Sequence, residues 1–129
     1  MMRLLPALLA LLFLTGCGGN ETAQTAEVTY QQITQEEAKE MMDTQEVVIL
    51  DVREQHEYDG GHIPEAVLLP VGTITEDTAA AVIDDLDTVV LVYCRSGNRS
   101  KTASQALASL GYTNVYEFGG INDWPYEVE

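Results

Sequence analysis

The sequence predicts one α/β domain whose central sheet is small, mostly parallel and flanked by helices. Two apolar runs rich in β-branched residues, 47–50 and 89–93, are typical of strands buried on both faces of a sheet. Segments with helical spacing alternate with these runs at short intervals, as helices between parallel strands do. A chain of 129 residues with 46% hydrophobic residues has room for one such domain and enough apolar side chains for its core.

The first half of the domain begins with a loosely alternating segment, residues 28–33, that predicts a short strand. Thr34 and Glu37 have the spacing of a capping box, so a helix is expected to begin after Thr34. The buried strand at residues 47–50 follows, and after it comes a turn rich in glycine and proline. Residues 66–69 form one more short apolar stretch.

The second half repeats the alternation. Thr75 is placed to cap a helix, and residues 89–93 predict the second buried strand. Residues 100–110 have helical apolar spacing, and Gly111 stands where a left-handed residue would end that helix. Residues 115–118 predict a last strand.

The net charge of −15 limits the partners of this chain. A protein with this much negative charge repels the phosphate backbone of nucleic acids, and it repels an anionic bilayer surface as well. We therefore expect no nucleic-acid partner, and any attachment to a membrane must come from something other than electrostatics.

The N-terminus predicts such an attachment. Arg3 precedes an apolar stretch, residues 4–14, which is too short to span a bilayer but suits a secretory signal peptide. Residues 14–17, Leu-Thr-Gly-Cys, resemble the bacterial lipobox, in which the cysteine is acylated and becomes the mature N-terminus. The alternative is an ordinary signal peptide with an incidental Cys17.

These features divide the chain into three parts. Residues 1–16 are expected to be the signal peptide, residues 17–27 the lipidated cysteine and a polar tether, and residues 28–129 the domain. The protein is thus expected outside the cytoplasm, held at the bacterial cell membrane by the lipid on Cys17.

Cys94 is the other of the two cysteines, so lipidation of Cys17 would leave it without a disulfide partner. A buried strand delivers Cys94 to the edge of the sheet, where ligands of parallel sheets bind. The next residues must curl into a helix, and Gly97 and Asn98 tolerate the positive φ that a tight curve requires. Such a loop aims its backbone N–H groups at one point and binds an anion there, helped by the helix N-terminus.

Positive charge is concentrated around the same loop, because Arg95, Arg99 and Lys101 are half of the six basic residues in the chain. Cations, amide groups and a helix N-terminus all favour a thiolate, so we expect the pKa of Cys94 to be lowered. The loop is therefore predicted to be an anion cradle around a reactive sulfur.

Three motifs in order carry a resemblance to a known family. Residues 94–100, CRSGNRS after a strand, resemble the active-site loop of the rhodanese family, and DVRE at 51–54 with EY at 57–58 and GHIP at 61–64 is similar to an earlier family segment. Gly-Tyr at 111–112, Asn-Val-Tyr at 114–116, Gly-Gly-Ile at 119–121 and Trp124 resemble its closing segment. The sequence departs from the family pattern at Gln55, where proline is frequent, and at Glu65, where glycine usually follows the His-Ile-Pro of residues 62–64. The local turn at Glu65 should therefore differ from that of the family.

The resemblance covers most of residues 28–129 and implies a rhodanese-like three-layer fold and a thiosulfate sulfurtransferase activity. Cys94 would take the outer sulfur of a small anionic donor such as thiosulfate, and a thiol or cyanide would accept it from the resulting persulfide. It further implies that the donor site is formed by Arg95, Ser96, Gly97, Asn98 and Arg99, supported by Asp51, Arg53 and Ser100. No metal or organic cofactor is expected, and the protein is expected to be a monomer.

Two other functions remain open. Cysteine-based phosphatases and arsenate reductases place five residues between cysteine and arginine, whereas four separate Cys94 from Arg99. A tethered binding module could also use the same fold without turnover. His56 and His62 lack metal-ligand spacing and are expected to serve structure or surface.

Overall fold

The computed structural model describes residues 29–129, so the signal peptide, Cys17 and the tether at 17–27 lie outside the described residues. The elements are β1 Gln31–Gln32, α1 Gln35–Thr44, β2 Val48–Asp51, α2 Gln55–Asp59, β3 Val67–Leu68, η2 Val71–Thr73, α3 Glu76–Val82, β4 Val89–Cys94, α4 Asn98–Ser109, β5 Asn114–Gly120 and η3 Ile121–Asp123. Within residues 29–129, no helix is long and apolar enough to cross a membrane.

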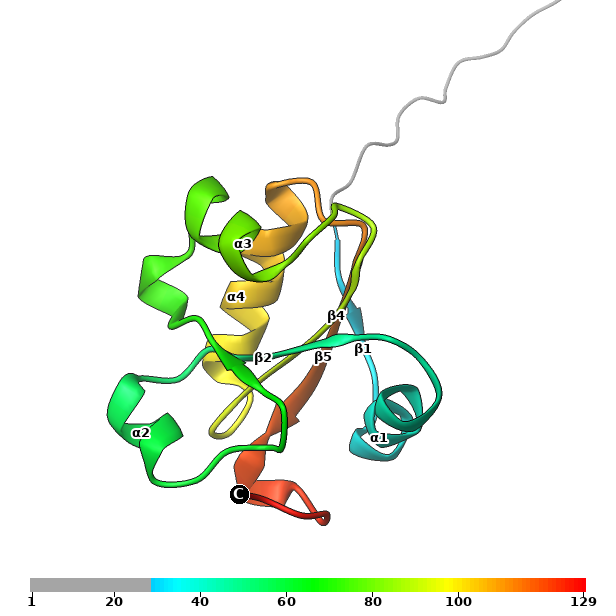
Figure 1. Ribbon diagram of the computed structural model, residues 1–129, viewed down its shortest axis with the longest axis vertical. Coiled ribbons are helices and arrows are strands. Elements are labelled where there is room, and N and C mark those ends of the chain that lie inside the picture. The colour runs from blue at the N-terminus through cyan, green and yellow to red at the C-terminus, as the bar shows by residue number, and fades with distance from the viewer. Residues whose placement is uncertain (1–28) are drawn as a thin grey trace, which may run out of the picture.

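The central sheet has five strands in the order β1-β5-β4-β2-β3, and all neighbouring strands are parallel (Figure 1). The mostly parallel sheet predicted from the sequence is confirmed. Because β4 lies between β2 and β5, the residues at the carboxyl ends of these three strands meet at one edge. Cys94 is the last residue of β4, and its partner in the register of the neighbouring strand β5 is Gly120.

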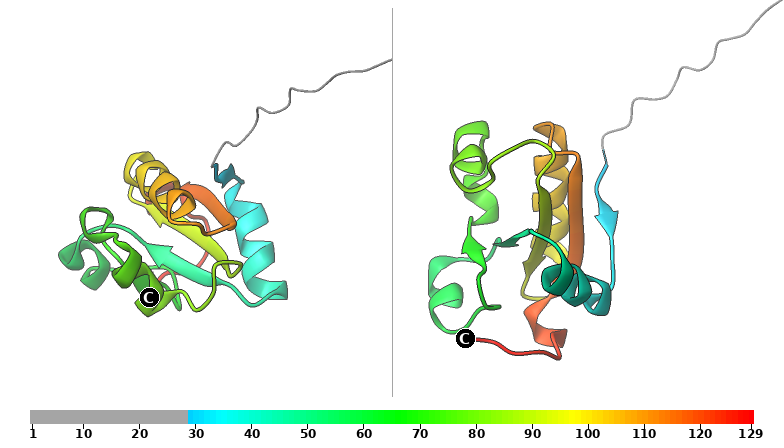
Figure 2. Two further views of the ribbon diagram at one scale, coloured as in Figure 1. Left: turned by 90° about the horizontal axis from the view of Figure 1, so that it is seen from above. Right: turned by 45° about the vertical axis from the view of Figure 1, so that its right-hand side comes forward.

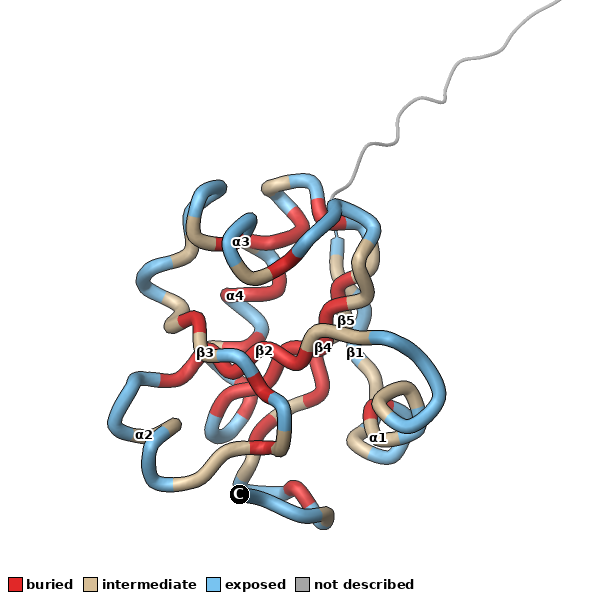
Figure 3. Tube along the Cα trace, viewed as in Figure 1, coloured by how far each residue is buried: buried red, intermediate tan, exposed pale blue. Residues whose placement is uncertain are grey.

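Helices cover both faces of the sheet, which makes three layers (Figure 2). One face of β4 presents Val90 and Val92 to a core shared with α3 and α4. The other face presents Leu91 and Tyr93 to a core that includes α1 and Trp124 near the C-terminus. Both faces of β4 are buried, as Figure 3 shows by the red trace at the centre of the fold, which explains the unbroken apolar run in its sequence.

Most expected helix ends are found. Thr34 caps α1 in a capping box with Glu37, and Thr75 caps α3. α4 begins at Asn98, two residues earlier than its apolar spacing predicted, and Gly111 follows it with a φ of 108°.

One helix was missed. The segment after β2 was expected to be only a turn, but it contains α2. Five residues are too few to show helical periodicity, and the signal that was available is the capping-box spacing of Glu54 and Glu57, in which the Glu57 carboxylate accepts from the Glu54 N–H at 2.9 Å. This helix places Glu57 beside the loop that carries Cys94.

Glu65 adopts a φ of 72° and is the only non-glycine residue of the described chain with a positive φ. A left-handed conformation costs an ordinary residue about 1–2 kcal/mol. Glu65→Gly should therefore raise the free energy of unfolding by about 0.5–1 kcal/mol, the greater freedom of glycine in the unfolded chain offsetting part of the gain. Urea denaturation measures the change. Glu65→Ala is the control, because it removes the carboxylate but keeps the strained φ; an equal gain in both variants would contradict the strain argument.

Candidate active site

The loop between β4 and α4 wraps around the sulfur of Cys94. Gly97 has a φ of 110°, and the curl it permits brings its own N–H to 3.0 Å from Cys94 Sγ. The prediction of a positive φ was right for Gly97 and wrong for Asn98, which is the first residue of α4. The curl is completed within one residue because glycine has no Cβ to obstruct it.

The hydrogen-bond donors of the loop favour the thiolate. Burial, which leaves Cys94 only 1% exposed, acts to raise the pKa of its thiol. The side chain of Ser100 and the backbone N–H groups of Ser100, Gly97 and Ser96 outweigh burial and bring the pKa of Cys94 below its ordinary value of 9.0. The backbone N–H groups of the loop thus surround the Cys94 sulfur and point toward it.

The end of β5 supports this loop from below. Gly120 lies so close to the backbone of Arg95 and Ser96 that a Cβ at position 120 would lie 2.6 Å from Ser96 N and closer still to the carbonyl group of Arg95. The Asn122 N–H donates to the carbonyl oxygen of Arg95 at 3.1 Å. Gln35 of α1 donates to the carbonyl oxygen of Gly120 at 2.8 Å, which fixes the glycine in turn.

A buried carboxylate stands beside the sulfur, and sequence reasoning missed it. Glu117 is 2% exposed, and its Oε2 accepts from the Ser100 hydroxyl at 2.5 Å and from the Gly119 N–H at 2.9 Å. Ser100 Oγ lies 3.4 Å from Cys94 Sγ, so one hydroxyl connects the carboxylate to the thiol. The available signal was an acidic residue inside an expected strand that ends at the same edge as Cys94.

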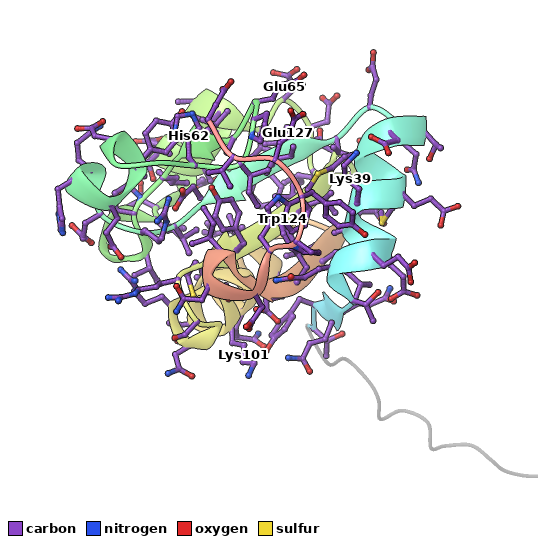
Figure 4. All side chains as sticks on the ribbon, turned by 90° about the horizontal axis from the view of Figure 1, so that it is seen from below. Lys39, His62, Glu65, Lys101, Trp124 and Glu127 are labelled. Carbon is purple, nitrogen blue, oxygen red and sulfur yellow. The ribbon has the colours of Figure 1, made fainter. Side chains whose placement is uncertain are left out.

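Arg99 braces the loop. Its guanidinium donates two hydrogen bonds to the Glu57 carboxylate, at 2.8 and 3.0 Å, and so ties α4 to α2. The sequence predicted that three cations would stabilise the thiolate, but this one is neutralised by its partner. Arg95 and Lys101 are exposed, the latter on the outer side of α4 (Figure 4). The amide groups and the hydroxyl therefore act on Cys94 more directly than the cations do.

This ion pair makes stability depend on pH. The Arg99 side chain holds the pKa of Glu57 down at about 2, against an ordinary 4.5, although burial acts to raise it. The pair should contribute its full stabilisation above pH 4.5 and lose it as the pH falls from there toward 2. Because Arg99 is partly exposed to solvent, we expect only about 1 kcal/mol.

Urea unfolding of the native chain and of Glu57→Gln at neutral pH and at pH near 3 tests this. The native chain should be the more stable at neutral pH, and the gap should narrow in acid. A gap that does not change with pH would contradict a charge-based role for the pair.

Asp51 and Arg53, which the family resemblance implied as supporting residues, form a buried network at the end of β2. Arg53 is buried and makes a two-pronged ion pair with Asp51, the closest approach being 2.7 Å. The hydroxyl of Tyr93 donates to the same carboxylate at 2.6 Å. This network fixes the residue immediately before Cys94.

Neither histidine belongs to the site of Cys94 itself. His62 lies beside the C-terminal segment (Figure 4), its ring stacked on Tyr58 and its backbone paired with that of Glu129. His56 is exposed on α2. In the part of the chain that the structure describes, no group of three or more His, Cys, Asp or Glu side chains could hold a metal ion.

A surface hollow of about 370 Å³ adjoins the loop. Arg95, His56, Glu57 and Asn122 are among its lining residues, so its wall combines the exposed cation of the loop with polar groups of α2 and η3. A larger hollow of about 800 Å³ lies at the starts of β2 and β4, at the opposite end of the strands from Cys94. Of these two hollows, the one beside Arg95 is the one that adjoins the loop.

Comparison with known proteins is consistent with this geometry. The family model for the Rhodanese-like domain matches residues 34–126. The thiosulfate sulfurtransferase GlpE of Coxiella burnetii is 36% identical over 96 residues, which cover 74% of this chain and 87% of that protein. The thiosulfate sulfurtransferase PspE of Escherichia coli is 39% identical over 74 residues, covering 57% and 70% of the two chains.

Solved structures agree on the fold. A rhodanese-related protein from Thermoplasma volcanium superposes with a TM-score of 0.64 at 31% identity, covering 78% of this chain and 98% of the other. A structure described as rhodanese with anions from E. coli has a TM-score of 0.61 at 28% identity, covering 65% and 98%. The Alr3790 protein of Anabaena reaches 0.68 at 26% identity, covering 75% and 90%.

Proposed function

Because this chain belongs to the rhodanese-like domain family, we propose that it is a sulfurtransferase that carries sulfur on Cys94 as a persulfide. The donor is thiosulfate or a persulfide, and the acceptor is a thiol, or cyanide in an assay. One observation carries the proposal: amide groups and a hydroxyl converge on Cys94 Sγ, the arrangement that a sulfur anion requires.

The reaction has two halves. The Cys94 thiolate attacks the outer sulfur of thiosulfate; the new bond joins Sγ to that sulfur, and the old sulfur–sulfur bond breaks with its electron pair leaving on sulfite. The acceptor then attacks the outer sulfur of the persulfide and releases the Cys94 thiolate. Each half exchanges one nucleophile for another, so ping-pong kinetics are expected.

The loop suits both sulfur anions. In the persulfide, the negative charge lies on the outer sulfur. The N–H groups of Ser96 and Gly97 can donate hydrogen bonds to this sulfur, as they do to the thiolate. Arg95, exposed at the hollow beside the loop, offers a charge to the incoming donor. Arg99 is engaged by Glu57 and holds the loop in place.

The phosphatase alternative is weaker because four residues, not five, separate Cys94 from Arg99, and the smaller loop suits one sulfur better than a tetrahedral oxyanion. The full chain should form thiocyanate from thiosulfate and cyanide and should release no phosphate from an aryl phosphate. Phosphate release without thiocyanate formation would overturn the sulfurtransferase proposal. If the chain formed neither thiocyanate nor phosphate, the remaining function would be that of a tethered binding module.

We also propose that the domain works outside the cytoplasm, anchored by a lipid on Cys17. Residues 14–17 support this, and the net charge of −15 argues against electrostatic attachment to a bilayer. The full chain made in bacteria fed labelled palmitate should carry the label and sediment with membranes, and Cys17→Ala should do neither. A membrane-bound, labelled Cys17→Ala chain would contradict the proposal.

A further inference from the structure

Glu117 is a buried carboxylate at the site that the proposed chemistry does not use. Its carboxylate is 2% exposed and sits where β5 reaches the loop. Its oxygens accept from Ser100, from the Gly119 N–H and from the side chain of Gln32. Within residues 29–129, no Lys, Arg or His forms an ion pair with it. A buried, unpaired carboxylate is costly, so its position beside the nucleophile calls for a physical explanation.

The Ser100 hydroxyl has one proton and several acceptors. Its Oγ lies 3.1 Å from Gly97 O, 2.5 Å from Glu117 Oε2 and 3.4 Å from Cys94 Sγ. A carbonyl oxygen and an ionised carboxylate can only accept, and the carboxylate is both the closest and the charged acceptor. Glu117 is therefore the strongest competitor for the proton of Ser100, and it weakens the hydrogen bond that this hydroxyl can give the Cys94 thiolate.

Glu117 acts against the Cys94 thiolate in two ways. It competes with the sulfur for the proton of Ser100, and it places a like charge one hydroxyl away. The persulfide escapes most of this opposition. Its charge lies on the outer sulfur, one covalent bond beyond Sγ, while Sγ, the atom that faces the Ser100 hydroxyl, is neutral.

We propose that Glu117 is a positioning residue that, through the Ser100 hydroxyl, biases Cys94 toward the sulfur-loaded form. The inference rests on the proposed function only for the identity of that form. When thiosulfate loads the enzyme, the charge moves from Sγ to the outer sulfur and sulfite leaves with the electron pair of the broken bond. Moving the negative charge off Sγ reduces its repulsion by the Glu117 carboxylate. The carboxylate therefore favours formation of the persulfide and slows the transfer of its outer sulfur to the acceptor.

The other charges near Cys94 do not substitute for Glu117, because each is paired or faces solvent. They are Arg99 of α4 with Glu57 of α2, Asp51 with Arg53 at the end of β2, and the exposed Arg95 of the loop. Removing the charge of Glu117 should therefore stabilise the Cys94 thiolate, with no other charge compensating for the loss.

Glu117→Gln tests this, because the amide keeps the size and can still accept from Ser100 and from the Gly119 N–H. The pH at which Cys94 is half-alkylated by iodoacetamide should fall by about one unit. At a fixed ratio of thiosulfate to sulfite, the ratio of loaded to free chain, counted by intact mass, should fall by about threefold to tenfold. Glu36→Gln, an exposed carboxylate on α1, is the matched control and should change neither quantity.

Glu117→Asp separates the two effects. The shorter side chain keeps the charge but withdraws from Ser100, so the alkylation midpoint should fall by less than in the glutamine variant. It also serves as the test if Glu117→Gln does not fold. Unchanged midpoints and unchanged loading in these variants would overturn the inference. Shifted midpoints with no persulfide in any chain would uphold the effect of Glu117 on the thiolate and overturn the proposed function.

Discussion

Replacing Cys94 by serine is expected to abolish sulfur transfer without unfolding the domain. Serine has nearly the same shape, and its hydroxyl can occupy the ring of N–H groups that now surrounds Cys94 Sγ. An alcohol at this position stays protonated near neutral pH and forms no persulfide, so the covalent intermediate is lost. We expect thiocyanate formation to fall by at least about 1,000-fold.

The fold of this variant is checked by thermal unfolding, because Cys94 belongs to the core cluster that α3 and α4 share with the sheet. A midpoint within a few degrees of the native one would exclude unfolding as the cause of inactivity. Thiocyanate formation at a substantial fraction of the native rate in a folded Cys94→Ser chain would mean that another residue carries the sulfur.

Gly120→Ala is expected to be nearly as damaging, although Gly120 has no functional group. The added methyl group would overlap the Arg95 carbonyl and crowd Ser96 N, so the loop must move away from β5. Displacement of reacting groups by about 1 Å can lower a rate 100-fold, and the overpacking should also cost about 1–3 kcal/mol of stability. Steady-state kinetics and urea denaturation measure the two effects separately.

The matched control is Gly72→Ala in η2, where an added Cβ would meet no atom within 4 Å. That variant should retain native activity. If Gly120→Ala were as active as Gly72→Ala, the loop would not depend on its close contact with β5, and the geometry described for Cys94 would lose its support.

The fold and the tight loop around Cys94 could be predicted because their signals are local in sequence. The apolar run of β4, Gly97 and the helix that follows lie within a few residues of Cys94, and together they specify a loop that curls around the sulfur. The capping boxes of α1 and α3 are equally local. Where a local rule failed, as at Asn98, the helix simply began earlier than its apolar residues suggested.

The supporting residues could not be predicted because they depend on contacts between distant segments. Glu57 lies 42 residues from Arg99 in the sequence, and α2, which places it, is too short to show a period. Glu117 lies 17 residues from Ser100, and a carboxylate in a strand says nothing of which side chain it will meet. Gly120 matters only because the backbones of β5 and the loop touch, and no pattern of residue types reports that distance.

Intact-mass measurement of the full chain after thiosulfate treatment shows most plainly whether the loop around Cys94 holds a sulfur anion. We expect a gain of one sulfur atom that maps to Cys94, disappears on addition of cyanide and is absent from Cys94→Ser. A native, alkylatable Cys94 that never gains sulfur from thiosulfate or from a small persulfide donor would contradict this expectation.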